Sequence, residues 1–166
     1  MAMKSLTDLY IHFLRDVLYA EKQGMKTVRR MSRRAENDDL KTLFTEQADD
    51  TEAQIENIEK AFELIDKSAR GVRCEAMDGI IEESKDLMEE AQDGAVRDAA
   101  MIAAAQAMKH YEITRYGTLA AWARQLGHED AAKLMKDNAD RDIAADKALS
   151  KLAEKHLNQQ ADTLAA

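Results

Sequence analysis

Apolar residues recur at intervals of three and four along four long stretches of the chain, and a shorter stretch between the second and the third has the same pattern. This spacing is typical of α-helices that bury one face. Ser5 is a candidate N-cap for the first helix, and Gly127 is a natural end for the third. The long helices are expected over residues 5–35, 40–65, 95–126 and 129–156, and the short one over 74–88.

The connections between these stretches predict how the helices are arranged. Only a few residues separate the first helix from the second, and the third from the fourth, so each pair is expected to be an antiparallel hairpin. A much longer connection, which contains the short helix, joins the two hairpins. Two hairpins with one long crossover are the ferritin-like arrangement of a four-helix bundle. The sequence therefore predicts one all-α domain over residues 1–166, a ferritin-like bundle with a short additional helix.

The composition of the chain argues against several fold classes and several kinds of partner. The 166 residues include no proline and only six glycines, which argues strongly against a β-sandwich or barrel. The 24 basic and 32 acidic residues leave a net charge of −8, which argues against nucleic acid as a partner. Cys74 is the only cysteine, so no intrachain disulfide is possible. Asp8 and Asp16 interrupt the apolar pattern of the amino terminus, so we expect no signal peptide and no membrane span, and a soluble, cytoplasmic protein.

Polar residues interrupt the apolar stripe of every long helix near its middle. Antiparallel packing would bring these four interruptions to one level of the bundle. Burying an unpaired charge costs several kcal/mol, so charged side chains that meet inside the bundle need a common partner, such as a metal ion. The alternative is that these side chains lie at the edges of the helices and point to solvent. The interrupting residues are Glu21 in the first helix, Gln47, Asp50, Thr51 and Gln54 in the second, Lys109 and Glu112 in the third, and Asn138, Arg141 and Asp142 in the fourth.

Six segments of the chain, in order and over nearly its whole length, resemble the YciF-type ferritin-like stress proteins of bacteria. They are AEKQ (20–23), TEAQIE (51–56), EAMDGIIEE (75–83), VRDAAMIAAAQ (96–106), HYEITRYGTL (110–119) and DAAKLMK (130–136). The resemblance implies a four-helix bundle with a short fifth helix, a homodimer, and a candidate di-iron carboxylate site like that of rubrerythrin. It implies a role in stress whose biochemistry is undefined, with an oxidoreductase activity inferred from the site.

The family's metal site carries over to this chain only in part. Glu21 and Glu112 match glutamates of the family pattern, whereas Asp50 and Asp142 are one methylene shorter than the glutamates they replace. The remaining site positions have lost their ligands: a histidine is replaced by Gln47, and two glutamates are replaced by Lys109 and Arg141. The candidate metal residues are therefore Glu21, Asp50, Glu112 and Asp142, as a remnant site.

The charges of this remnant site favour an interpretation without metal. Two divalent ions need roughly four carboxylates and two imidazoles. Here four acids would face the two fixed positive charges of Lys109 and Arg141, which leaves a charge of about −2. We therefore expect a non-catalytic protein without a cofactor, in which a buried ionic network replaces the metals. The alternative is a di-iron oxidoreductase or peroxide-handling protein that retains one or two ions of iron or manganese, as the resemblance implies.

The third long helix has apolar residues on more than one face, which is wider than a single core stripe needs. We therefore expect a homodimer with this helix, or the short helix, in its interface. The sequence indicates no other protein partner. The residues concerned are Met101, Ala104, Met108, Ile113, Leu119, Ala121 and Trp122.

Overall fold

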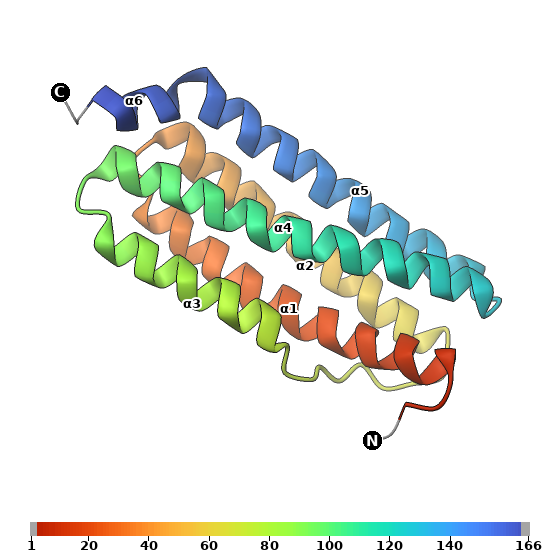
Figure 1. Ribbon diagram of the computed structural model, residues 1–166. Coiled ribbons are helices and arrows are strands. Elements are labelled where there is room, and N and C mark those ends of the chain that lie inside the picture. The colour runs from red at the N-terminus through yellow and green to blue at the C-terminus, as the bar shows by residue number, and fades with distance from the viewer. Residues whose placement is uncertain (1–2, 164–166) are drawn as a thin grey trace.

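Four long helices lie side by side in the computed structural model, and a shorter helix packs on one side of them (Figure 1). The structure describes residues 3–163. No helix within that range is both long enough and apolar enough to cross a membrane. The elements are α1 (Leu6–Arg34), α2 (Asp38–Glu63), α3 (Glu75–Glu90), α4 (Gly94–Gln125), α5 (Glu129–Leu152), the π-helical turn η1 (Ala153–Leu157) and α6 (Asn158–Asp162).

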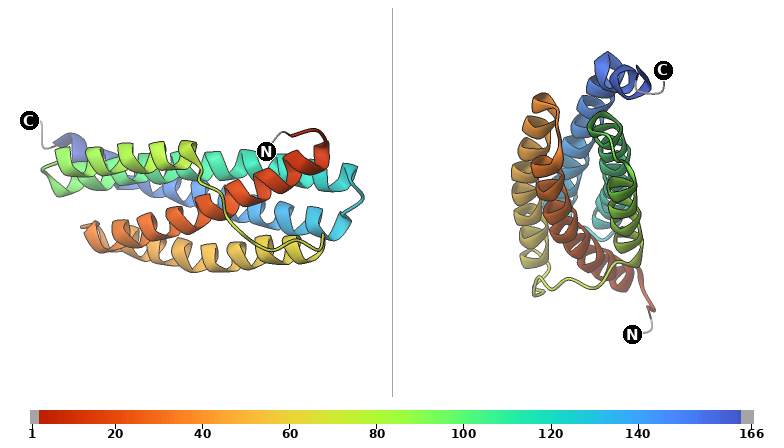
Figure 2. Two further views of the ribbon diagram at one scale, coloured as in Figure 1. Left: turned by 90° about the horizontal axis from the view of Figure 1, so that it is seen from below. Right: turned by 90° about the vertical axis from the view of Figure 1, so that its left-hand side faces the viewer.

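The predicted fold class is confirmed. Helices α1 and α2 form one antiparallel hairpin and α4 and α5 form the other, while the long crossover from α2 to α4 carries α3 (Figures 1 and 2). Between the hairpins, α1 packs on α4 and α2 packs on α5. The short helix α3 lies against α4 and α1.

Side chains at the helix ends explain where the elements begin and stop. Polar atoms of Ser5, Asn37, Cys74 and Asp93 each accept a hydrogen bond from a backbone N–H in the first turn of the following helix. Gly127 has a φ of +80°, as a residue that ends a helix in the left-handed region does. These local signals can be read from the sequence, and they place the predicted boundaries within a few residues of the observed ones.

The carboxyl end of α5 differs from the prediction of a helix that continues to residue 156. The regular α-helix ends at Leu152 and passes into the π-helical turn Ala153–Leu157. The side chains of Ala153 and Leu157 are both buried in the core. The wider turn redirects the chain so that α6 packs against α4.

Part of the broad apolar surface of α4 is covered within one chain. Met101 and Met108 are buried in one cluster with Met77 and Met88 of α3. Leu119 is also fully buried. Ile113 and Trp122 are only half-buried and Ala121 is exposed, so helices of the same chain account for part of this surface. The homodimer itself stays a prediction.

The apolar core is divided into two clusters. One cluster includes Met31 and Phe44, near the turn between α1 and α2, and the other includes Leu14 and Ile58, toward the opposite end of the bundle. Between the clusters lies the level of the bundle at which the four apolar stripes are interrupted. The two-part core thus isolates a polar layer from solvent at both ends of the bundle.

Candidate functional site

Eight polar side chains from four helices form a buried polar layer in the middle of the bundle. None of them is more than 4% exposed, so the predicted meeting of the four interruptions occurs. Within this layer, the four charged residues are called the ionic layer below: Glu21, Lys109, Glu112 and Asp142. The other four members of the polar layer are Gln47, Thr51, Gln54 and Asn138.

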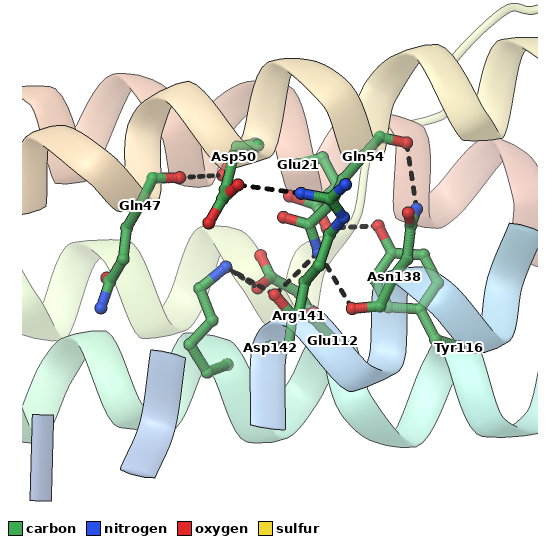
Figure 3. A network of polar contacts seen from close by, with 11 residues as sticks. Glu21, Gln47, Asp50, Gln54, Glu112, Tyr116, Asn138, Arg141 and Asp142 are labelled. Carbon is green, nitrogen blue, oxygen red and sulfur yellow. Dashed lines mark hydrogen bonds and ion pairs between the residues drawn. The ribbon is translucent and has the colours of Figure 1, made fainter. Parts of the chain in front are cut away.

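Lys109 lies at the centre of the ionic layer. Its ammonium group donates to Oε2 of Glu112 at 2.8 Å and to Oδ1 of Asp142 at 2.9 Å. Glu112 lies three residues further along the same helix, whereas Asp142 comes from α5. Figure 3 shows the two carboxylates converging in the space between the helices. The ammonium therefore joins the two helices of the second hairpin through charge-assisted hydrogen bonds.

Neutral side chains extend these contacts to α2. The amide nitrogen of Gln54 donates to Oδ1 of Asp142 at 2.8 Å and to the backbone carbonyl of Asn138 at 3.2 Å. Asn138 donates in return to the backbone carbonyl of Gln54 at 3.0 Å (Figure 3). Asn57, which the sequence analysis missed, donates to Oδ1 of Asn138 at 2.8 Å. These reciprocal amide bonds fix the register of α2 against α5.

Glu21 completes the ionic layer from α1. The hydroxyl of Tyr116 donates to its Oε1 atom, and its Oε2 atom is buried without a partner among the described residues. A buried tyrosine hydroxyl usually has a hydrogen-bond partner, so a tyrosine on the apolar stripe of α4 is a signal from which this bond could have been predicted. Gly24 lets α1 approach closely, since a Cβ there would lie 3.3 Å from Oε1 of Glu112.

Asp50 and Arg141 do not belong to the buried layer, which corrects the prediction. They form an exposed ion pair at 2.9 Å, with 58% and 44% of their side chains accessible. Asp50 and Arg141 each lie three residues after a buried member of the layer, Gln47 and Asn138 respectively. The residues four positions after Gln47 and Asn138, which are Thr51 and Asp142, are the buried ones. At 100° per residue the third position turns to the outer edge of the stripe, and the fourth stays closer to its centre. An exposed pair of this kind contributes little stability.

The ionic layer therefore contains three acids and one base, and this excess of acids changes its proton affinities. Burial, followed by the Glu112 carboxylate, raises the pKa of Glu21 well above its usual range. Burial also raises the pKa of Glu112 to about 7, although the Lys109 ammonium opposes this. Burial alone would lower the pKa of Lys109, but Glu112, Asp142 and Glu21 together raise it well above normal. The ammonium thus stays charged, and Glu21 is the carboxyl group most inclined to keep its proton.

The raised pKa of Glu112 predicts a protein that becomes more stable as the pH falls from 8 to 5. The unfolded chain releases this proton near pH 4.5 and the folded chain near pH 7. The stabilisation is therefore complete below pH 4.5 and lost as the pH rises to about 7, and a pKa difference of this size is worth about 3 kcal/mol. The raised pKa of Asp142 acts in the same direction.

Urea unfolding at several pH values measures this effect. The variant Glu112→Gln should make the pH profile less steep between pH 5 and 8, because it removes one of the three carboxyl groups with a raised pKa and keeps the shape of the side chain. Glu82→Gln, on the exposed face of α3, is the matched control and should leave the profile unchanged. Stability of the parent that rises steadily from pH 5 to 8 would contradict the prediction.

The residues of the ionic layer do not fit a pair of metal ions. Glu21, Glu112 and Asp142 each offer a carboxylate oxygen within 4.8 Å of the others, and no histidine or cysteine joins them in the described part of the chain. The Lys109 ammonium already binds two of these three carboxylates. Two divalent ions would require more acids and two imidazoles, and they would lie beside a fixed positive charge.

The pocket that reaches the ionic layer is too small for a substrate. Its volume is about 10 Å³, and its lining includes Gln47, Lys109 and Asp142, with Asp50 and Arg141 also contributing. A cavity of this volume holds about one water molecule. Ligand sites in proteins usually span about 300–1,000 Å³. The pocket at the layer is therefore well below the usual size of a ligand site.

Comparison with known proteins shows the family to which the chain belongs. A family model described as a domain of unknown function, DUF892, matches residues 5–162. The chain belongs to the DUF892 family. Among curated proteins, Protein YciF of Escherichia coli strain K12 is 40% identical over 166 residues, which cover 99% of this chain and 100% of the relative. The resemblance to YciF-type proteins is confirmed.

Two solved structures of similar chains have the same fold. The E. coli stress protein YciF superimposes with a TM-score of 0.89 at 40% identity, over 94% of this chain and 99% of that chain. YcfI of Rhodopseudomonas palustris, a proposed structural protein, superimposes with a TM-score of 0.87 at 41% identity, over 89% of this chain and 94% of that chain. The relatives of this chain thus include a stress protein and a proposed structural protein, and neither name states a reaction.

Proposed function

We propose that this chain is a stress-associated structural protein that is not an enzyme, and that its buried ionic layer replaces the di-metal site of ferritin-like proteins. The observation that carries the proposal is the position of the Lys109 ammonium, 2.8 Å from Glu112 and 2.9 Å from Asp142. A lysine there supplies, without any cofactor, the positive charge that a metal would bring to the carboxylates. It is a permanent part of the chain, so the bundle needs no metal to fold.

Two further observations support a role without catalysis. The pocket at the ionic layer has a volume of about 10 Å³, which leaves no space for a substrate beside the charged groups. The names of the relatives point to stress and to structure, not to a reaction. A small buried polar network of this kind specifies how helices pair, and we assign that task to the layer here.

The alternative is an oxidoreductase or peroxide-handling protein that holds iron or manganese. One observation favours it: Glu21 and Asp142 each have a buried carboxylate oxygen without a partner among the described residues. These oxygens are of the type that bind divalent cations. The alternative is weaker because Lys109 occupies the space between two of the three acids.

Metal analysis distinguishes the two candidates. We expect less than about 0.1 iron, manganese or zinc ion per chain in protein purified without a chelator and without a histidine tag, and no change in melting temperature on adding EDTA, since a bound metal would stabilise only the folded state. About one ion per chain, together with a lower melting temperature in EDTA, would support the alternative and contradict our proposal.

We further propose that the protein acts as a homodimer in the cytoplasm and binds neither nucleic acid nor membranes. The net charge of −8 disfavours contact with phosphate backbones. A bundle whose task is structural is expected to present a surface to a partner, and a second copy is the simplest such partner.

A further inference from the structure

A groove runs between α2 and α5 on the outside of the bundle, beyond the exposed Asp50–Arg141 pair. Its volume is about 310 Å³. Three half-buried apolar side chains line it, Leu43 from α2 and Ala148 and Leu152 from α5. Leu43 and Leu152 also pack against the buried core beneath them. The groove is thus an apolar strip that the chain itself leaves uncovered.

The two rims of the groove carry opposite charges. Asp39 and Glu46 line the α2 rim, and Lys151 and Lys155 line the rim formed by α5 and η1. All four side chains are exposed. None of them makes an ion pair within residues 3–163. Each rim therefore offers free charge of a single sign to an incoming surface.

A groove with one acidic and one basic rim is complementary to a copy of itself. If two copies meet face to face about a twofold axis that runs along the groove, the acidic rim of each lies over the basic rim of the other. The register of the helices permits this pairing, because α2 and α5 are antiparallel and Asp50 contacts Arg141. Counting outward from that contact places Asp39 at the level of Leu152, between Lys151 and Lys155.

We propose that this groove is the contact surface of a homodimer, with the twofold axis along the groove. The apolar strip would be buried at the centre of the contact. Asp39 of one copy would face Lys151 and Lys155 of the other, and Glu46 would lie about 9 Å from Lys151 along the groove. The proposal rests on the homodimer of the proposed function and names its surface. It moves the interface from α4 and α3, where the sequence suggested it, to α2 and α5.

Two charge-reversal variants test the surface. Asp39→Lys with Glu46→Lys makes both rims basic, and Lys151→Glu with Lys155→Glu makes both rims acidic. Each variant alone should dissociate at least about tenfold more readily than the parent, because like charges then face one another. An equimolar mixture of the two should form a heterodimer close to the parent in affinity, because every contact is complementary again. Analytical ultracentrifugation measures all three dissociation constants.

The control Lys60→Glu with Lys67→Glu makes the same change in net charge as the second of these variants, on exposed residues outside the groove, and it should leave the dimer unchanged. Far-UV circular dichroism reports whether each variant remains helical. If the parent is a monomer at micromolar concentration, both the homodimer and this surface are overturned. A dimeric parent whose variants dissociate like the control would overturn the surface alone and leave the proposed function intact.

Discussion

Replacing Lys109 with alanine should lower the free energy of unfolding by about 3–5 kcal/mol, which is the cost of breaking a buried ion pair by removing one partner. The ammonium is within 3 Å of two carboxylates, at 2.8 and 2.9 Å, and only 5% of its side chain is exposed. Without it, Glu112 and Asp142 lose their counter-charge and repel each other in a medium of low dielectric constant. In a chain of this size the loss corresponds to a fall in melting temperature of about 6–20 °C.

Thermal and urea unfolding at pH 7.5 provide the measurement. Lys147→Ala is the matched control, since Lys147 is exposed on α5 and makes no ion pair in the described part of the chain, and it should change the stability by less than about 0.5 kcal/mol. The effect of Lys109→Ala should shrink at pH 5, where the carboxyl groups take up protons. A melting temperature within a degree or two of the parent at pH 7.5 would mean that Lys109 does not hold the ionic layer together.

The variant Lys109→Glu should be less stable still in the absence of metal, and divalent metal should recover much of the loss. It places four carboxyl groups in the ionic layer and leaves no positive charge among them. Iron(II) or manganese(II) would then supply the charge that the lysine provides in the parent. A ligand that binds only the folded state stabilises it by about 2.7 kcal/mol at one hundred times its dissociation constant.

Melting curves of the parent and of Lys109→Glu, each titrated with manganese(II), make the comparison direct. We expect the melting temperature of the variant to rise with metal concentration and that of the parent to stay constant. Magnesium(II) at the same concentration controls for a general effect of divalent ions on an acidic protein. An equal response of the parent to manganese would show that Lys109 does not exclude metal, and an unresponsive variant would show that the remaining acids cannot hold one.

The prediction of the fold from sequence succeeded because its signals are local or periodic. Spacings of three and four place the core face of each helix, and Ser5 and Gly127 mark ends that the structure confirms. Short connections force neighbouring helices to be antiparallel, so the two hairpins and the crossover follow from the lengths of the connections between the helices. The π-helical turn Ala153–Leu157 could not be predicted, since it depends on how the end of α5 packs against α4.

The existence of a polar layer was likewise determined by the sequence, whereas its membership was decided only by tertiary packing. Periodicity defines a stripe to within about one residue, which is enough to detect that all four stripes are interrupted but not to tell Asp50 from Thr51, or Arg141 from Asp142. Packing buries Thr51 and Asp142 and leaves Asp50 and Arg141 exposed. The hydroxyl of Tyr116 joins the network only because the fold places it opposite Glu21. Distances between helices are set by interlocking side chains from distant parts of the chain, so the neighbours of a buried charge follow from the fold and not from the sequence around it.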